Sequence, residues 1–258
     1  MALINPSNEF LVVKHSHLNN LNAGFDLGKI VDDALKLEAH TNGRRVVVAI
    51  EGDIIQLAHG EPIFTHQSFF RPSLEQFGEL RKAGIAVSLE EAFDAYQTFM
   101  EQYNGRLVLC LEPKPITTSA TIHHAITELK RRGIRDAYFD SFFARCLTDV
   151  RKANLCQQTT YPLSKHAIGN VWIAPILVDT ELEPPEDIIT VPYPSSFGFL
   201  RVPVIYGAVG DANKLARVAD TPHCYGAYVR FKEGHGRIAG VLRLLYVSST
   251  NNPQSRKA

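Results

Sequence analysis

The strongest constraint on the fold is the segment RRVVVAIEGDIIQL, in which five consecutive apolar residues, 46 to 50, run directly into two acids. A continuous apolar run of this length is typical of a strand covered on both faces, as in a parallel sheet. Glu51 and Asp53 stand two residues apart, so their side chains point to the same face of that strand. Because buried carboxylates are costly unless a cation or hydrogen bonds compensate them, the pair predicts a charged site at the strand end.

A second apolar strand ends in the same way. The segment RLVLCLEPK carries Glu112 and Lys114, again two residues apart. Three acids and a lysine at the ends of two buried strands predict a metal-centred site for an anionic substrate. The expected ligands Glu51, Asp53 and Glu112 all offer oxygen atoms, so we expect Mg²⁺ or Ca²⁺ rather than zinc.

Strands and helices are expected to alternate along most of the chain. Further strands are predicted at 10–15, 61–66, 136–142, 169–178, 187–193, 202–209 and 224–231. Helices are predicted at 27–40, 72–83, 88–103, 118–132, 144–153 and 211–220. This alternation is typical of an α/β protein with a parallel sheet. About eight parallel strands over this length favour a closed (β/α)8 TIM barrel, with the less regular half at the C-terminal side.

The composition limits the class of protein. The chain has 258 residues, 45% of them hydrophobic, and its 27 basic and 27 acidic residues cancel. We therefore expect one domain over residues 1–247, a disordered polar tail over 248–258, and no nucleic-acid partner. The four cysteines form no CxxC pair, which argues against a structural zinc site. With no signal-peptide pattern and no apolar stretch of about 20 residues, a cytoplasmic protein without a transmembrane segment is expected.

Several motifs, in this order, resemble those of one enzyme family. They are VVKHS, AIEGDIIQLAHGEPIFTHQ, VSLEEAF, LCLEPK, YFDSFFARCLTDVR, YGAVGDANKLARV and CYGAYV. The glycerophosphodiester phosphodiesterases, which are TIM barrels of the phosphatidylinositol-phosphodiesterase-like superfamily, have a similar pattern. In that family a histidine ends the first strand, E-x-D ends the second, P-V-hydrophobic-x-H follows a glycine-containing turn, and an acid-x-lysine lies on the third strand. The match is clearest over residues 10–155.

The resemblance implies a substrate class and roles for the site residues. The substrate would be a phosphodiester of glycerol or of a related small alcohol. His15 and His66 would form a general acid–base pair, since histidine titrates near working pH. Lys114 would place its charge on a phosphate oxygen. Attack by water and attack by a neighbouring substrate hydroxyl, which would give a cyclic phosphate, both remain open.

The chain also departs from the family pattern. His15-Ser16-His17 stands where the family has His-Arg-Gly, so the arginine that contacts phosphate is missing. His66-Gln67 stands in place of His-Asp. His17 competes with His15 for the role of first histidine, and His15 is preferred because it directly ends the apolar run.

Two other functions are kept open. One is a phospholipase-D-like lipase acting on lysophospholipids or sphingolipids, which would make transient contact with a lipid surface through an apolar lip such as Phe69-Phe70. The other is a catalytically weak barrel that binds a phosphorylated ligand, an idea favoured by the missing arginine. The sequence does not indicate an oligomeric state.

Overall fold

The structure is a computed structural model of the chain. It describes residues 4–5, 7–15, 18–23, 26–66, 70–103, 105–166, 188–192, 204–209, 211–221 and 224–229. Several expectations therefore lie outside the described residues. These are the strand at 169–178, the polar tail at 248–258, His17 and Phe69.

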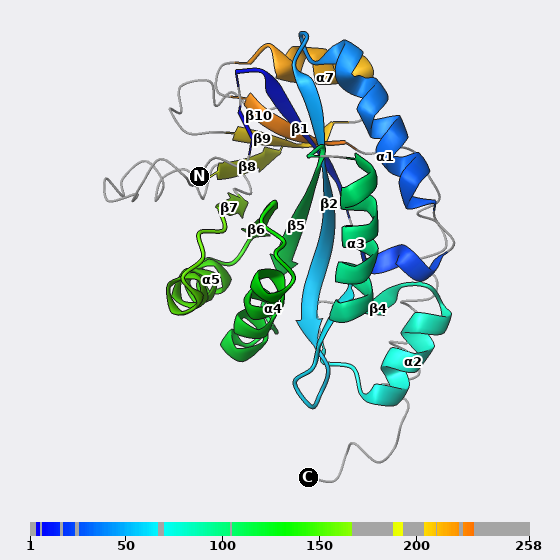
Figure 1. The fold of residues 1–258 in the computed structure, drawn as a ribbon, viewed down its shortest axis with the longest axis vertical. Helices are drawn as coiled ribbons and strands as arrows, with labels where there is room; N and C mark the ends of the chain where they lie inside the picture. The colour runs from blue at the N-terminus through cyan, green and yellow to red at the C-terminus, as the bar shows by residue number, and fades with distance from the viewer. Residues whose placement is uncertain are drawn as a thin grey trace.

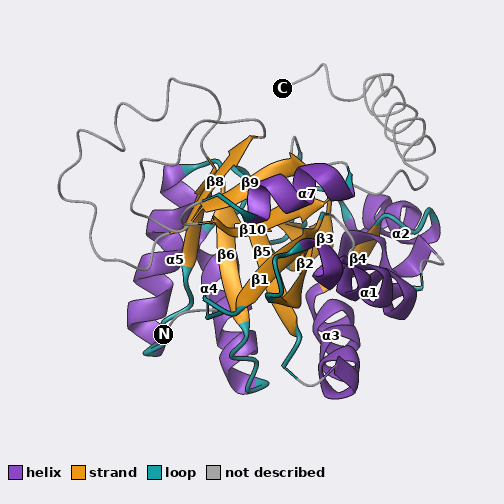
Figure 2. Cartoon of the chain, turned by 90° about the horizontal axis from the view of Figure 1, so that it is seen from above, coloured by secondary structure: helices purple, strands orange, loops and turns teal. Residues whose placement is uncertain are grey.

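Eight of the described strands run parallel and form a closed barrel (Figures 1 and 2). They are β1 (Glu9–Lys14), β2 (Arg45–Gln56), β5 (Leu107–Pro113), β6 (Ala137–Ser141), β7 (Leu163–His166), β8 (Ile188–Pro192), β9 (Val204–Val209) and β10 (Cys224–Val229). Their order is β1-β10-β9-β8-β7-β6-β5-β2, and six residue pairs between β1 and β2 close the ring. The predicted α/β class and TIM-barrel architecture are confirmed.

Helices cover the outside of the barrel, as the view from above shows (Figure 2). They are α1 (Leu27–Leu35), α2 (Leu74–Lys82), α3 (Leu89–Tyr103), α4 (Ser119–Arg131), α5 (Ala144–Gln157) and α7 (Ala212–Ala219), with the 3₁₀ turns η1 (Leu18–Ala23) and η2 (Lys36–His40). The SLEE pattern forms the capping box it predicts: Glu91 N–H donates to Ser88 Oγ, and Ser88 N–H donates to the Glu91 carboxylate. On α2, Phe77 and Leu80 are buried, whereas Leu74 is 64% exposed.

The long strand β2 continues beyond the barrel into a small antiparallel extension. Its last residues pair with β3 (Pro62–Thr65), and β3 pairs with β4 (Ala86–Ser88). Since Ile54 lies opposite Phe64, the next residues along this hairpin bring His66 back level with Gly52. The hairpin therefore returns a residue from outside the barrel to the strand end that carries the two acids.

The C-terminal half of the barrel is the less regular one, as expected. The fifth barrel strand is β7, a four-residue segment for which no strand was predicted. The pairing of β10 with β9 shifts register twice, between Cys224 and Gly226 and between Ala227 and Val229. Within the described residues, α7 packs against β9 and β10, and α5 packs against β7.

The core has an inner and an outer layer. Buried, mostly apolar side chains fill the lower barrel interior. Ile4 precedes β1, and the other residues of this layer lie on barrel strands: Leu11, Val13, Val47, Ala49, Val108, Cys110, Tyr138, Ile205, Tyr225 and Tyr228. The intervening positions, among them Phe10, Val12 and Val48, pack outward against the helices. Gly52 also faces outward, where an added Cβ would come within 2.8 Å of Leu18 Cβ, so a glycine is required between the two acids.

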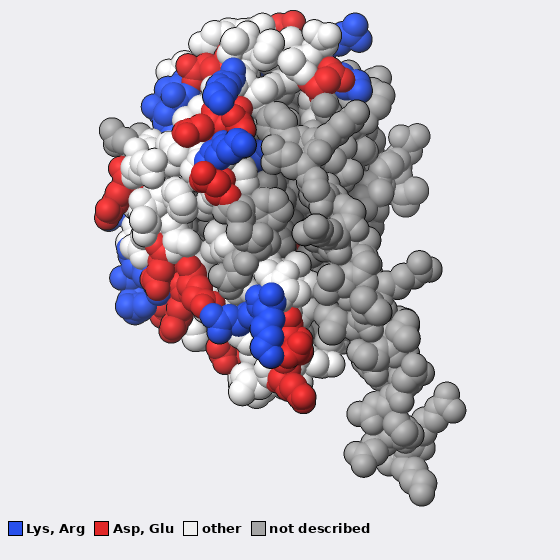
Figure 3. Space-filling model, turned by 90° about the vertical axis from the view of Figure 1, so that its right-hand side faces the viewer, with Lys and Arg blue, Asp and Glu red and all other residues white. Residues whose placement is uncertain are grey.

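The surface shows no segregation of charge on the face in Figure 3. Lysine and arginine side chains lie among aspartates and glutamates over the described residues of that face. In the described part of the chain, no helix is long and apolar enough to cross a membrane.

Candidate active site

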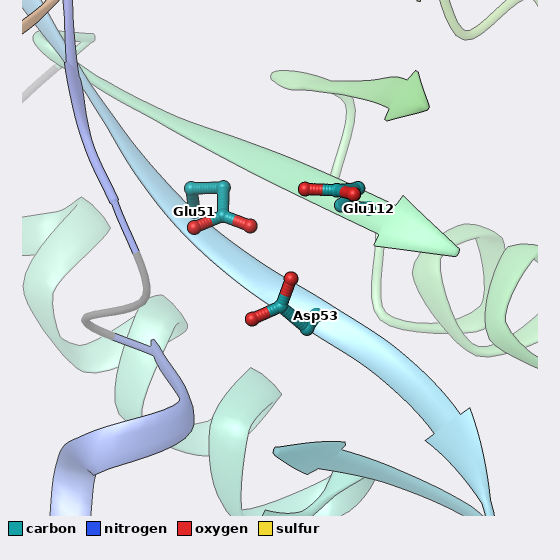
Figure 4. Close-up of side chains that lie close together, drawn as sticks. All are labelled: Glu51, Asp53 and Glu112. Atoms are coloured by element: carbon teal, nitrogen blue, oxygen red, sulfur yellow. The ribbon is translucent and has the colours of Figure 1, made fainter. Parts of the chain in front are cut away.

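Three carboxylates converge at the carboxyl ends of two neighbouring strands. Glu51 and Asp53 come from β2 and Glu112 from β5, and Figure 4 shows the three groups gathered around one space. Asp53 pairs in register with Glu112. One oxygen of each group lies within 4.8 Å of the others, and all three residues are buried. The register of β2 against β5, rather than a loop, therefore sets the spacing of these acids.

Asp53 is the centre of the cluster. The Lys114 ammonium forms ion pairs with Asp53 Oδ1 and Glu112 Oε1. The His66 Nδ1 atom lies 2.8 Å from Asp53 Oδ2. Asn19 donates to the same carboxylate oxygen at 2.5 Å and accepts the Asp53 backbone N–H at 2.8 Å. These contacts fix both the rotamer and the backbone of Asp53.

The electrostatics of the cluster favour the charged forms. Burial by itself would raise the pKa of Asp53, but the charge of Lys114 and the hydrogen bond from His66 hold it well below its usual range. Burial would lower the pKa of Lys114, yet Asp53, Glu112 and Glu51 raise it above its ordinary value. The hydrogen bond to Asp53 raises the pKa of His66. The carboxylate of Asp53 and the ammonium of Lys114 are therefore both ionised at neutral pH.

The two predicted histidines face each other at the mouth of the barrel. The ring centroids of His15 and His66 are 5.5 Å apart, with the rings near perpendicular at 77°. His15 directly follows β1, and His66 directly follows β3. Because Nδ1 of His66 binds Asp53, a proton transfer at this ring would take place at Nε2.

The residues present fit a divalent cation. Three buried carboxylates supply an all-oxygen donor set of the kind that Mg²⁺ and Ca²⁺ prefer. Burying three acids together is costly without positive charge. Lys114 and the hydrogen bond from His66 supply part of that compensation. A divalent cation would supply the rest.

The structure brings all six predicted site residues together, and their roles remain predictions. These residues are His15, Glu51, Asp53, His66, Glu112 and Lys114. Ser141, at the end of the neighbouring strand β6, donates its hydroxyl to the Pro113 carbonyl. Sequence reasoning missed Asn19, which lies in the 3₁₀ turn η1 and carries no motif that would single it out.

The comparisons with known proteins concern the fold. No family profile and no curated relative matches the sequence. Solved structures do resemble it, among them three phosphodiesterases. The first, assigned as a glycerophosphoryl diester phosphodiesterase from Silicibacter pomeroyi, has a TM-score of 0.58 at 15% identity and covers 93% of this chain and 95% of its own.

The other two are glycerophosphodiester phosphodiesterases. The protein from Parabacteroides distasonis has a TM-score of 0.55 at 14% identity, covering 92% of this chain and 98% of its own. The protein from Agrobacterium tumefaciens has a TM-score of 0.52 at 16% identity, covering 85% and 96%. The family resemblance drawn from the motifs thus has a structural counterpart, and the chain has the fold of the glycerophosphodiester phosphodiesterases.

Proposed function

We propose that the chain is a metal-dependent phosphodiesterase that cleaves glycerophosphodiesters or a related small-alcohol phosphodiester. The observation that carries the proposal is the meeting of three buried carboxylates with two facing histidines at the mouth of a barrel of this fold. Active sites of such barrels form at the carboxyl ends of the strands, where these residues lie. Of the solved structures that the chain resembles, two are named as phosphodiesterases of this class and a third is assigned to it.

Each residue has a proposed task. Glu51, Asp53 and Glu112 would hold the cation, which as a Lewis acid would neutralise charge on the phosphate. Lys114 lies against two of these carboxylates, so its ammonium is within reach of a phosphate oxygen bound there. Asn19 would keep Asp53 in position.

His15 and His66 would move the protons. One histidine accepts the proton of the attacking hydroxyl or water as the new oxygen–phosphorus bond forms. The other donates a proton to the leaving alcohol oxygen as its bond to phosphorus breaks. The two imidazoles lie edge to face with their ring centroids 5.5 Å apart, so both could reach oxygens of one phosphate bound beside them.

The test is cleavage of a mixed panel of glycerophosphodiesters and lysophospholipids with Mg²⁺, Ca²⁺ or chelator, followed by phosphorus NMR. Chelator-sensitive cleavage of the glycerophosphodiesters is expected, and the product, cyclic phosphate or monoester, identifies the attacking group. Cleavage of lysophospholipids alone would instead support the lipase, for which the described residues give no separate support. No cleavage with either metal would contradict the proposal and favour a phosphate-binding barrel.

A further inference from the structure

A hydrogen bond crosses the interior of the barrel next to the candidate site. Tyr228 on β10 donates its phenol hydrogen to Asp140 Oδ2 on β6, at 2.5 Å. In the closed strand order, β10 and β6 are four strands apart in either direction, so the bond joins opposite walls. Both residues are buried. Tyr228 pairs with Val13 of β1. Asp140 directly follows Phe139, which pairs with Leu111 of β5.

Close packing of the barrel interior does not require the pair of Tyr228 and Asp140. The interior of a TIM barrel is ordinarily filled by branched aliphatic side chains. Asp140 is instead a fourth buried carboxylate, on the strand next to Glu112. A buried carboxylate is costly unless it is hydrogen-bonded, and Tyr228 supplies such a bond. What the pair adds over two aliphatic residues is a fixed direction for the phenol ring.

That ring contacts one of the two histidines of the candidate site, His15. The centroid of the Tyr228 ring lies 6.4 Å from that of His15, at 62°, in an edge-to-face arrangement. His15 in turn lies against His66, and His66 binds Asp53. Burial, and then the charge of Asp140, raise the pKa of Tyr228 well above its usual value, so the phenol remains a donor. Successive contacts therefore connect Asp140 to the carboxylate cluster through Tyr228, His15 and His66.

We propose that Tyr228 is a positioning residue for His15. Asp140 fixes the phenol, and the phenol ring holds the imidazole of His15 in its orientation toward His66. The effect on turnover rests on the proposed function, whereas the placement of His15 can be measured without any substrate.

The test compares Tyr228→Phe with Tyr225→Phe. The first variant keeps the ring and removes the hydrogen bond to Asp140. The second is a matched control on the same strand, because the Tyr225 hydroxyl accepts the Ile4 backbone N–H at the amino end of the barrel, away from His15. The His15 ring resonances, assigned with His15→Gln, should move in Tyr228→Phe and stay in place in Tyr225→Phe. Turnover should fall about 10- to 100-fold in Tyr228→Phe with little change in KM, as expected when a reacting group is misplaced.

A second pair of variants distinguishes the effect of the phenol's position from the effect of the charge on Asp140. Asp140→Asn keeps an oxygen that accepts from the phenol, so the His15 resonances and most of the turnover should be retained. Asp140→Leu removes the acceptor and should reproduce the Tyr228→Phe result. If Tyr228→Phe does not fold, the two Asp140 variants still test whether Tyr228 positions His15.

Two results would overturn the proposal. One is a folded Tyr228→Phe protein with unchanged His15 resonances. The other is a folded Asp140→Asn protein that behaves like Asp140→Leu. If the wild-type protein cleaves no phosphodiester, the proposed function fails, and the His15 resonances still decide whether Tyr228 positions that ring.

Discussion

Two levels of the barrel interior, built from the same strands, differ in what fills them. On β2 the inward positions are Val47 and Ala49 at the lower level, then Glu51 and Asp53 at the upper level. On β5, Val108 is followed by Cys110 and then by Glu112. Inward-facing side chains thus change from apolar to charged within two residues. The height along the barrel, rather than the identity of the strand, decides whether a position serves packing or chemistry.

The two levels also differ in what stabilises them. The lower level gains from removing apolar surface from water and from close packing. The upper level loses the hydration of its acids, and specific partners offset this loss: Lys114, His66 and Asn19 for Asp53. Apart from Tyr228, which contacts His15, residues at the lower level should change stability when substituted, and those at the upper level should change activity.

The largest effect is expected from Asp53→Asn, which keeps the shape and removes the charge at the centre of the upper level. We expect kcat/KM to fall about a thousandfold, because several kcal/mol of transition-state stabilisation depend on the proposed cation site. Steady-state kinetics on the preferred phosphodiester would measure it. Glu128→Gln, an acid on the outer helix α4, is the control. Activity within a few-fold of wild type in Asp53→Asn would contradict the site assignment.

His66→Ala should have the next largest effect. Removing a general acid or base typically costs 10²- to 10⁴-fold in kcat, while the affinity for the metal should stay nearly intact because the three carboxylates remain. His59→Ala is a matched control, since His59 lies on the same hairpin and also binds a carboxylate, Glu61, at 3.0 Å. Normal turnover in His66→Ala would refute the assignment of this histidine.

Lys114→Met should lower turnover and raise the affinity for the metal. Turnover should fall about 10- to 100-fold through the loss of a charged contact to phosphate. The affinity for Mg²⁺ or Ca²⁺ should rise, because a positive charge that contacts Asp53 and Glu112 is removed. Calorimetric titration and kinetics on the same sample would measure both, with Lys82→Met, an exposed lysine on α2, as control. A loss of metal affinity would show that the lysine helps to build the site rather than to bind phosphate.

Leu11→Ala tests the lower level and should have the smallest effect on catalysis. Truncating a fully buried leucine costs about 2–5 kcal/mol of unfolding free energy. Turnover per folded molecule should be unchanged at a temperature well below the unfolding transition. Denaturant unfolding and kinetics would be compared, and a fall in kcat of the folded variant would show that the two levels are coupled.

The sequence predicted the upper level well because its signals are local. Glu51 with Asp53, and Glu112 with Lys114, are i and i+2 pairs at strand ends, so their common direction follows from strand geometry alone. The return of His66 could be predicted only through the resemblance, since its position depends on the β2–β3 hairpin. Asn19 and Tyr228 act across long stretches of chain, and nothing in their own segments indicates their partners.

The fold was predicted less well where the strands are short. The segment LSKH of β7 has one strongly apolar residue, Leu163, so its sequence lacks the continuous run that identified β2 and β5. Its place as a barrel strand is decided by pairing with β6 and β8. Leu74 stands at helical spacing from the buried Phe77, but it lies one residue after the Ser73 cap, in the exposed first turn of α2.

The most direct test of the account is a calorimetric titration of the wild-type protein and Glu112→Gln with Mg²⁺ and with Ca²⁺, since it requires no knowledge of the substrate. We expect saturable binding of one cation per chain in the wild type. We also expect a large loss of affinity when one of the three carboxylates becomes an amide. Binding that is absent from the wild type, or equal in the two proteins, would contradict a metal centre at Glu51, Asp53 and Glu112.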